Sequence, residues 1–529
     1  MFHAGRMEKV TSLLARRGFV FPSGDIYGSL AGFYDYGHYG VQLKRNIERS
    51  WWEFFVQKRE DIVGMDGSII SSSAIWNASG HLKEFTDPLI ECNNCHGRFR
   101  ADQLVEDELK LSVEGLSLDA INALIKEHKL KCEKCKGDLE IAKPFNLMFK
   151  THVGASEDER AIAYLRPETA QMIFTNFKQV QLTSRKQLPF GIAQSGKAFR
   201  NEISPRNFLF RVREFSQMEL EYFINSQKMD VCAFLEKEDL SLEIIVLTAA
   251  MQDKKQTEGR KFAFKELVEK KVIGNKWHAY LVLLSYGWFL LIGIKPENLR
   301  IREHVKQELS HYSQETWDIE YRYPWGWKEI AGIANRTDYD LKQHMVESKK
   351  DLSYFDEESK AKIIPFVIEP SFGLERAFLT AVFDAYEEKI EVKEPREKQE
   401  SGEAKPGGNS ENSKPVEEKK NILHLSPAIS PVQVAVFPLM KKDGLAEKAR
   451  EIFAALKAKF ACEYDESGSI GRRYARQDEI GTPYCITIDY DTLKDNAVTI
   501  RERDFAKQKR VNLDEIILVL DGLLRGAQF

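Results

Sequence analysis

The 529-residue chain is predicted to be an α+β protein with a large N-terminal body and a compact C-terminal α/β domain. The chain is too long to fold around a single hydrophobic core, and its length suggests about three folded units. A charged stretch offers almost nothing to bury, which predicts a flexible linker at 390–420. Before it, apolar and charged residues alternate at 199–223, as they do in antiparallel strands. After it, apolar strands alternate with helical segments.

Composition indicates globular cores in a cytoplasmic protein. Hydrophobic residues make up 43% of the chain, and a net charge of -4 argues against broad nucleic-acid coating while leaving a local basic face open. The start, MFHAGRMEKV, lacks the apolar core of a secretory signal, so the seven cysteines are expected to be reduced or metal-bound. The apolar run at 279–294 is shorter than the ~20 residues that span a bilayer, which predicts a buried helix and no membrane contact.

The segment at 24–59 changes character halfway. Its first half is rich in glycine and tyrosine and is predicted to be a loop. From Val41 the apolar residues follow helical spacing as far as Phe55. The aromatic residues favour a subunit interface, with ordinary core packing as the alternative.

Two cysteine pairs with CxxC spacing predict a metal site. Each pair is followed closely by a glycine, as expected of a tight turn. Two such turns can present four thiolates to one tetrahedral zinc ion, so we predict a structural zinc site in an insertion at 92–135. Four free thiols are the alternative, and His96 is a possible substitute ligand. The four thiols belong to Cys92, Cys95, Cys132 and Cys135.

The segment at 199–223, FRNEISPRNFLFRVREFSQMELEYF, places many charges among β-compatible residues. Alternation on both sides of the sequence Ser-Pro-Arg-Asn predicts two antiparallel strands joined by a long polar loop. Burying these charges is costly unless a charged ligand meets them. Arginine suits a phosphate, and a carboxylate suits an ammonium or hydroxyl group. A solvated hairpin with ion pairs is the alternative. The charged residues on either side of this central sequence are Arg200, Glu202, Arg211, Arg213, Glu214, Glu219 and Glu221.

Three further segments place charges next to apolar strands. RPETAQ at 166–171 follows an apolar stretch, and the segment at 323–341 carries Glu329 in a tryptophan-rich strand. The segment at 364–386 is predicted to be a buried strand followed by a helix with Arg376 in its first turn. An arginine that enters a glycine-started helix suits the phosphate or the base of a nucleotide.

The C-terminal part, 421–529, alternates apolar strands with helices, as in a small α/β domain that can fold independently. Between these elements, GSIGRRYARQDEIGTP at 468–483 gathers several arginines around Tyr474. Arginine beside an aromatic ring suits phosphate contact and base stacking in single-stranded RNA, with a solvated loop as the alternative.

Together these segments resemble the three signature motifs of class II aminoacyl-tRNA synthetases, and among them the glycyl-tRNA synthetases of the homodimeric, archaeal/eukaryotic-like type. GFYDYGHYG and the helix after it resemble motif 1, FRNE with RVREF resembles motif 2, and EPSFGLER resembles motif 3. RPETAQ, QMELE and the C-terminal domain fit the glycine enzymes. His38 departs from motif 1, where relatives usually have proline. Each motif alone is weakly specific, whereas their order and joint presence are highly specific.

The resemblance implies a domain plan. A class II catalytic domain at 1–389, built on an antiparallel sheet flanked by helices, would carry the zinc-ribbon-like insertion at 92–135 and a helical insertion at about 225–315. The linker at 390–420 would lead to an anticodon-binding domain at 421–529.

The resemblance also implies substrate-binding residues. Arg200 would hold the α-phosphate, Phe215 and Arg376 would stack on the two faces of adenine, and Glu329 would lie near Mg²⁺. The implied catalytic residues are Arg200, Glu329 and Arg376. The implied ATP-binding residues are Arg200, Asn201, Glu202, Arg211, Val212, Phe215, Glu329, Ile330, Gly373 and Arg376. The implied glycine-binding residues are Arg100, Glu168, Glu219, Glu369, Pro370 and Ser371.

The function that the resemblance implies is activation of glycine by ATP and transfer of glycine to tRNA(Gly). ATP would be a substrate, Mg²⁺ a cofactor and Zn²⁺ a structural ion, in a cytoplasmic homodimer. Two alternatives remain. One is a non-catalytic RNA- or DNA-binding protein derived from a synthetase, and the other is a class II synthetase for threonine, proline or histidine.

Overall fold

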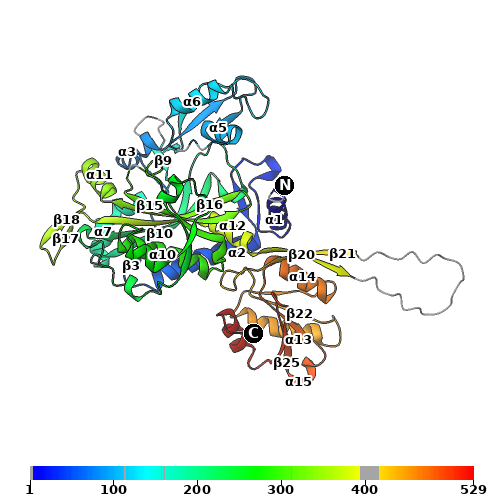
Figure 1. Ribbon diagram of the computed structural model, residues 1–529. Helices are drawn as coiled ribbons and strands as arrows, with labels where there is room; N and C mark the ends of the chain where they lie inside the picture. Colours follow the sequence, from blue (N-terminus) through cyan, green and yellow to red (C-terminus); the bar gives the residue numbers. More distant parts are fainter. Residues whose placement is uncertain are drawn as a thin grey trace. The chain divides into compact units, whose positions relative to one another are not determined.

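The computed structural model describes residues 4–111, 113, 115–155, 158, 161–310, 312–393 and 416–529 (Figure 1). The chain divides into two compact units. The larger unit combines Val20–Tyr36 with Ile47–Thr380, and the smaller unit combines Glu8–Phe19, Gly37–Asn46 and Ala381–Phe529. The smaller unit therefore contains segments from both ends of the chain.

A nine-stranded, mostly antiparallel sheet forms the centre of the larger unit. Its strands are β3 (Ile62–Gly64), β10 (Phe190–Phe199), β11 (Glu214–Ile224), β12 (Glu243–Leu247), β13 (Arg260–Ala263), β14 (Leu299–Glu303), β15 (Glu315–Tyr323), β16 (Gly326–Thr337) and β19 (Phe366–Gly373). They lie in the order β13-β12-β14-β15-β16-β19-β11-β10-β3, and the pairs β12–β14 and β10–β3 are parallel. This sheet confirms the predicted α+β class.

The charged segments meet in the middle of this sheet. β10 and β11 pair antiparallel, which confirms the predicted strand pair, and β11 pairs in turn with β19. The loop between β10 and β11 contains a short 3₁₀ turn at Phe208–Phe210. β19 pairs with β16 on its other side and leads directly into helix α12 (Leu374–Ala385).

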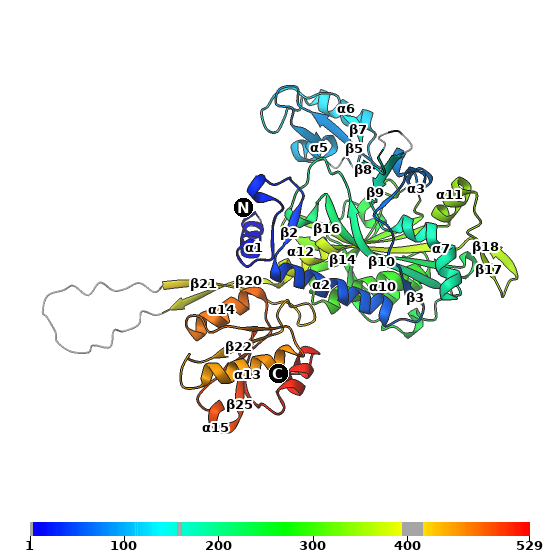
Figure 2. The same cartoon turned by 180° about the vertical axis from the view of Figure 1, so that it is seen from behind.

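Helix α10 (Lys276–Leu291) covers one face of these strands (Figures 1 and 2). Its Trp288 contacts Phe372 of β19 at a centroid distance of 5.3 Å. Because successive side chains of a strand point to opposite faces, the side chain of Ser371 points away from α10. The helix predicted from the apolar run at 279–294 is thus confirmed as a buried one. None of the helices in the described ranges is long and apolar enough to cross a membrane.

Shorter elements complete the larger unit. Its small sheets contain β1 (Val20–Pro22) and β2 (Tyr34–Tyr36); β4 (Ile70–Ser72), β8 (Phe149–His152) and β9 (Ile162–Leu165); and β17 (Tyr354–Asp356) and β18 (Ala361–Ile363). Its other helices are α3 (Ser73–Ala78), α4 (His81–Glu84), α7 (Ala170–Ser184), α8 (Ala249–Asp253), α9 (Phe264–Glu269) and α11 (Tyr339–Ser348). Helix α2 (His38–Trp52) has residues in both units.

The region of the two cysteine pairs has a small sheet and core of its own. Its strands are β5 (Thr86–Glu91), β6 (Arg98–Arg100) and β7 (Lys143–Asn146). Helices α5 (Ala101–Leu109) and α6 (Leu118–Glu127) lie between the cysteine pairs, which confirms the helical reading of that stretch.

The segment at about 225–315 is not the helical insertion that the resemblance implied. It contains α8, α9 and α10, but it also supplies β12, β13 and β14 to the central sheet. These strands are only four or five residues long. The apolar helix therefore dominates the sequence pattern, and tertiary pairing determines the strands.

The smaller unit contains a five-stranded sheet in the order β23-β22-β24-β25-β26. Its strands are β22 (Val434–Pro438), β23 (Cys462–Tyr464), β24 (Tyr484–Ile488), β25 (Ala497–Glu502) and β26 (Gln508–Asn512), and its helices are α13 (Leu445–Lys457), α14 (Ile470–Ile480), α15 (Thr492–Asp495) and α16 (Ile516–Leu524). Helix α1 (Ala4–Arg16) contributes to this unit through the ion pair of Arg16 with Glu479.

Two expectations for the C-terminal part need correction. Both ends of the predicted linker form paired strands, β20 (Tyr386–Lys393) and β21 (Val416–Leu423), which run antiparallel. The middle of the linker, 394–415, lies outside the described residues. The arginine-rich segment that looked like a loop forms α14, which ends at Gly481 in the left-handed conformation.

Candidate active site

Segments far apart in the sequence enclose a cavity of about 180 Å³ in the larger unit. β11 and β19 form its floor, and the β10–β11 loop and the first turn of α12 form its walls. The sheet therefore brings together all the residues predicted to bind ATP except Asn201 and Ile330. The predicted residues that line the cavity are Arg200, Glu202, Arg211, Val212, Phe215, Glu329, Ser371, Gly373 and Arg376.

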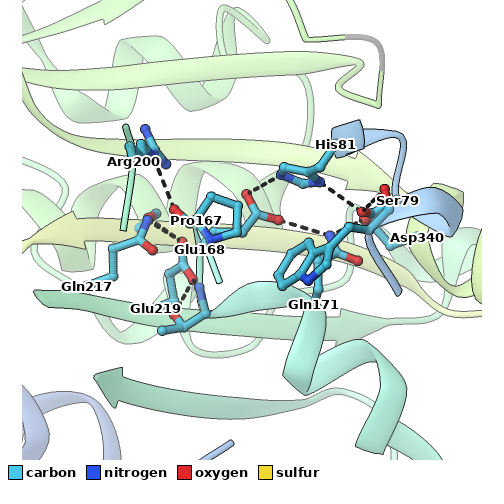
Figure 3. A network of polar contacts seen from close by, with 12 residues as sticks. Ser79, His81, Pro167, Glu168, Gln171, Arg200, Gln217, Glu219 and Asp340 are labelled. Atoms are coloured by element: carbon cyan, nitrogen blue, oxygen red, sulfur yellow. Dashed lines mark hydrogen bonds and ion pairs between the residues drawn. The ribbon is translucent and has the colours of Figure 1, made fainter. Parts of the chain in front are cut away.

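Arg200 lies between this cavity and the residues predicted to bind glycine. Its Nε donates a hydrogen bond of 3.0 Å to the backbone carbonyl of Pro167, the residue before Glu168 (Figure 3). Its guanidinium also lies 5.3 Å from the ring centre of Phe215. A guanidinium has five N–H donors, so this anchoring leaves donors for an anion.

Arg376 is fixed over the opposite wall. Its guanidinium lies 4.6 Å from the ring centre of Phe210, and Nη1 contacts both the backbone oxygen and the Oε2 atom of Glu329 at 3.0 Å. Burial raises the pKa of Glu329, but the charge and hydrogen bond of Arg376 outweigh it and lower that pKa overall. Glu329 is therefore ionised beside a cation.

Several polar atoms at the cavity have no hydrogen-bond partner among the described residues. They are Oε2 of Glu202, Nη1 of Arg211 and Oε1 of Gln217, all buried. The nearest approach between Arg211 Nε and Glu202 Oε2 is 3.9 Å, longer than a hydrogen bond. Buried polar groups are normally paired, so this set of donors and acceptors indicates a polar ligand.

Two of the residues predicted to bind glycine adjoin this cavity on the side of helix α7. Glu168 Oε1 accepts a hydrogen bond of 2.9 Å from Gln171, and Oε2 lies 3.4 Å from His81 Nε2 (Figure 3). Glu219 accepts hydrogen bonds from the backbone N–H of Thr169 at 3.0 Å and from the hydroxyl of Ser371 at 2.7 Å. The two carboxylates thus lie on a rigid polar frame.

The third predicted carboxylate, Glu369, is held by Arg336. Arg336 Nη1 lies 2.9 and 3.0 Å from the two carboxylate oxygens of Glu369, and its other nitrogens donate to Asp340 at 2.8 Å. Arg336 is only 1% exposed. Glu221 lies next to this group, with oxygen atoms of Glu219, Glu221 and Glu369 within 4.8 Å of one another.

A second cavity of about 780 Å³ adjoins the first and shares Phe210, Arg211, Glu329 and Arg376 with it. Its lining includes basic and acidic groups from β14, β15 and the cysteine-containing region: Arg100, Asp102, Arg206, Arg302, His304, Asp318 and Glu320. His304 Nε2 lies 2.7 Å from Asp318, and this contact outweighs burial and raises the pKa of His304 to about 9.

Seven of the residues predicted to bind ATP or glycine do not line the smaller cavity: Asn201, the three carboxylates beside the cavity, Ile330, Pro370 and Arg100. Ile330 and Pro370 each follow a residue that faces the site, so strand alternation turns them to the opposite face. Arg100 lies in the larger cavity, paired with Asp87 at 2.7 Å and with Asp102, rather than beside the glutamates assigned to glycine. The placement of Arg100 thus differs from its predicted role in glycine binding.

Sequence reasoning missed the residues that hold the carboxylates in place. They are His81, Thr169, Gln171, Arg336 and Asp340. A signal existed for the last two, since Arg336 and Asp340 are four residues apart and follow an apolar strand. His81 comes from a segment that carries no motif, so its contact with Glu168 could be found only from the fold.

The four predicted cysteines form one cluster. Their sulfur atoms lie within 4.8 Å of one another, with 3.5 Å between Cys92 and Cys135 and 3.6 Å between Cys95 and Cys132. Zinc–sulfur bonds of 2.3 Å in a tetrahedron place sulfur atoms roughly 3.8 Å apart, so the cluster could hold such an ion. His96 instead contacts Glu91 on the surface.

The arginines predicted to contact RNA are mostly used within the smaller unit. Arg473 donates to the backbone oxygens of Gly468 and Pro438, and Arg476 pairs with Asp465. The ring of Tyr474 is covered by Arg501 at 4.7 Å. This part of the chain therefore stabilises the domain.

Comparisons with known proteins match two parts of the chain to known domain families. Residues 149–386 match the family model "tRNA synthetase class II core domain (G, H, P, S and T)", and residues 433–523 match "Anticodon binding domain". The chain is 46% identical over 527 residues to the glycine–tRNA ligase of Caldanaerobacter subterraneus subsp. tengcongensis, covering 98% of each chain. It is 44% identical over 530 residues to that of Streptomyces coelicolor, covering 99% of each.

The identity extends across both units, and the cavity gathers the motif residues of the class II core. A third relative, the glycine–tRNA ligase of Acetivibrio thermocellus, is 44% identical over 522 residues, 98% of each chain. The chain belongs to the glycine–tRNA ligase family of class II aminoacyl-tRNA synthetases.

Proposed function

We infer that the chain is a glycine–tRNA ligase, which activates glycine with ATP and transfers it to the 3′ end of tRNA(Gly). The observation that carries this is the junction at Arg200, where a cavity with unpartnered polar atoms meets a cluster of buried carboxylates. A charged cavity suits a nucleotide triphosphate, and adjacent carboxylates suit an ammonium group.

For ATP, we propose that the smaller cavity holds the adenosine and the α-phosphate. Phe215 and Arg376 offer faces for stacking on adenine, and the unpartnered atoms of Glu202 and Arg211 offer hydrogen bonds. The larger cavity then receives the remaining phosphates. Glu329, joined there by Asp318, has the oxygen donors that Mg²⁺ prefers, and the ion would neutralise phosphate charge.

For glycine, we propose that the ammonium group binds among Glu168, Glu219 and Glu369, with the Ser371 hydroxyl beside it. Glycine has no side chain to recognise, so its selection depends on its charged groups and on a wall that clashes with larger amino acids. The hydrogen-bonded side chains around these carboxylates are held rigidly, so an amino acid with an added methyl group would clash with them.

The proposed reaction needs no protein nucleophile. The glycine carboxylate attacks the α-phosphorus of ATP in line, the bond to pyrophosphate breaks, and glycyl-adenylate forms. Arg200 stabilises the charge that develops on the phosphoryl oxygens, and alignment of the reactants supplies much of the rate. The terminal ribose hydroxyl of tRNA then attacks the adenylate, and AMP leaves.

The test is ATP–pyrophosphate exchange by the purified protein with glycine, alanine, serine, threonine, proline and histidine. Exchange with glycine alone supports both the activity and the pocket. Exchange with another amino acid would support the proposed chemistry but contradict the assignment of the glycine-binding residues. A folded protein that binds ATP and shows no exchange with any amino acid would contradict the enzyme assignment and favour a non-catalytic RNA-binding protein.

We also propose that the cysteine cluster holds a structural Zn²⁺ ion. The two turns have matching geometry: the N–H of Cys92 donates to the carbonyl of Gly97, and that of Cys132 to the carbonyl of Gly137. A side chain at Gly137 would lie 3.2 Å from the sulfur of Cys135, so glycine leaves the sulfur atoms room. All four donors are thiols, which suits a closed structural site.

We expect the Cys132→Ala variant to lose its zinc, from about one ion per chain to nearly none. The region around the cysteines should then become sensitive to proteolysis, because Cys132 is fully buried in the core of that region. Metal analysis and limited proteolysis measure both effects. The Cys462→Ala variant, altered outside the cluster, should keep its zinc. Full zinc content in Cys132→Ala would contradict the proposal.

We further propose that the chain is a homodimer that uses the segment after β1. Ile26 is 88% exposed, Tyr27 90% and Leu30 71%. Large apolar side chains exposed together on a soluble domain mark an interaction surface. The segment precedes the motif-1 helix that the resemblance assigns to the subunit interface.

We expect the double variant Ile26→Asp/Tyr27→Asp to shift the protein from dimer to monomer. Two charges in place of apolar contacts leave unpaired carboxylates at the interface. Light scattering coupled to gel filtration gives the mass of each form. Leu182→Asp, which changes an exposed residue of α7, is the control and should leave the mass unchanged. A dimer that persists in the double variant would place the interface elsewhere.

A further inference from the structure

Glu221 is a buried carboxyl group without a partner. The residue is 0% exposed, and neither carboxylate oxygen has a hydrogen-bond partner among the described residues. It lies on β11 two residues after Glu219, so both side chains point to the same face of the sheet. One of its carboxylate oxygens lies within 4.8 Å of one oxygen each of Glu219 and Glu369.

The sheet register places Glu221 between a carboxylate and the hydrophobic core. On one side, its direct partner on β10 is Ile192. On the other, the pairs Glu219–Ser371 and Tyr222–Ile368 set the register in which Glu221 stands opposite Glu369. Residues from these strands and from α7 form an apolar cluster that includes Ile192 and Phe223. No solvent therefore reaches the carboxyl group to stabilise a charge.

The cations near Glu221 serve other carboxylates. Arg336 is shared between Asp340 and Glu369, with contacts of 2.8 to 3.0 Å. His81 contacts Glu168. The charged groups that face Glu221 are thus Glu219 on β11, Glu369 on β19, Arg336 on β16, Asp340 on α11, and Glu168 with His81 beyond them.

Two facing carboxylates in a dry site cannot both ionise at neutral pH. Burial and the negative charge of Glu369 raise the pKa of Glu221 well above its usual value. The contacts decide which carboxyl holds the proton: Glu369 accepts two hydrogen bonds from Arg336, and Glu221 accepts none. The proton therefore belongs on Glu221.

We propose that Glu221 holds a proton while the glycine pocket is empty and releases it when the ammonium group of glycine binds. This inference rests on the proposed function, since it takes glycine as the ligand. In the release step the O–H bond of the carboxyl group breaks, its electron pair stays on the oxygen, and the proton passes to the buffer. The resulting carboxylate adds one negative charge near the ammonium group.

The sign of the pH dependence follows from linkage. Glycine lowers the pKa of Glu221, so a higher pH must favour glycine binding to the same extent. The KM for glycine should fall as pH rises through the titration of Glu221 in the free enzyme, by at most about tenfold per pH unit for one proton. Above that range the slope should vanish.

The Glu221→Gln variant tests this, because the amide has the shape of the neutral acid and cannot release a proton. We measure the KM for glycine by pyrophosphate exchange from pH 6 to pH 9 in wild type, Glu221→Gln and the control Glu243→Gln, an exposed residue at the start of β12. The wild type and the control should show the falling KM, and Glu221→Gln should lack it. Equal slopes in all three would overturn the proposal.

Thermal unfolding without glycine tests the proton separately. A carboxyl whose pKa is raised on folding loses stability as pH rises above its unfolded value of about 4.3. Glu221→Gln should therefore melt at a higher temperature than the wild type at pH 8 and show no gain near pH 4. A lower melting temperature at pH 8 would show that Glu221 is ionised and would overturn the proposal. Glu221→Met repeats the measurement if the amide variant does not fold.

These two measurements also separate the inference from the proposed function. A wild type that exchanges no pyrophosphate with glycine refutes the proposed function, whereas the unfolding comparison still decides whether Glu221 holds a proton. A wild type that activates glycine with a KM slope equal to that of Glu221→Gln leaves the function standing and refutes the proton release.

Discussion

Replacing Arg200 with alanine is expected to lower the rate of glycine-dependent pyrophosphate exchange by about a thousandfold, in the range of losses seen when a transition-state cation is removed. Arg200 lines the cavity where the α-phosphate would lie, and the carbonyl of Pro167 holds its Nε at 3.0 Å. In the proposed reaction its charge would meet the phosphoryl oxygens as the bond to pyrophosphate breaks. The loss should therefore appear in kcat and in kcat/KM together.

The fold should survive this change. The hydrogen bond to Pro167 contributes about 1 kcal/mol, which is small beside the stability of a domain. Arg200→Lys keeps the charge but not the planar fork, so its rate should lie between those of the wild type and Arg200→Ala. Arg260→Ala, at an exposed position on the edge strand β13, is the control and should match the wild type. Exchange at the wild-type rate in Arg200→Ala would remove Arg200 from the mechanism.

Sequence patterns predicted the parts of this site that lie within single segments. Alternation located the strand pair around Arg200 and Glu219, and the apolar stretch before Arg376 located β19 and α12. These predictions succeed because strand alternation and helix entry are local properties. Most of the residues predicted to bind ATP line one cavity, because they lie on or directly beside neighbouring strands of one sheet.

Contacts between distant segments could not be predicted in this way. His81 reaches Glu168 across 87 positions of the chain, and Arg336 reaches Glu369 across 33. Nothing in the local sequence marks His81 as a carboxylate partner, and the four-residue spacing that links Arg336 to Asp340 does not point to Glu369. The short strands β12 to β14 were missed for a similar reason, because pairing to the central sheet determines them. The arginines of α14 looked like RNA ligands until the fold showed their acidic and backbone partners.

Arg336 shows how much depends on one such contact. We expect Arg336→Met to destabilise the larger unit by about 3–5 kcal/mol, because it leaves the buried carboxyl groups of Glu369 and Asp340 without their partner. The guanidinium also lies 3.9 Å from the ring centre of Tyr312, and this contact is lost with it. Denaturant unfolding at pH 7 measures the change in the free energy of unfolding.

The pKa of Glu369 sets the pH dependence of this destabilisation. Burial raises that pKa to about 8 although Arg336 opposes the rise, so removal of Arg336 raises it further. A carboxyl with a raised pKa loses stability as pH rises, at the same slope in both proteins until the wild-type group ionises, so the gap between Arg336→Met and the wild type should widen from about pH 8 to pH 9. A gap that stays constant over this range would show that lost packing, rather than unpaired charge, causes the destabilisation.

Arg336 also acts on glycine through Glu369, which gives a test that a purely structural role would fail. In the folded fraction of Arg336→Met, the KM for glycine should rise by more than about a hundredfold, the scale of a lost charged contact, while the KM for ATP stays near the wild-type value. This follows because Arg336 touches the carboxylates and lies outside the cavity assigned to ATP. Equal increases in both constants would mean that the whole site has collapsed. A selective increase for glycine would identify Arg336 as the residue that positions Glu369, and it would connect the stability of the sheet to the recognition of the smallest amino acid.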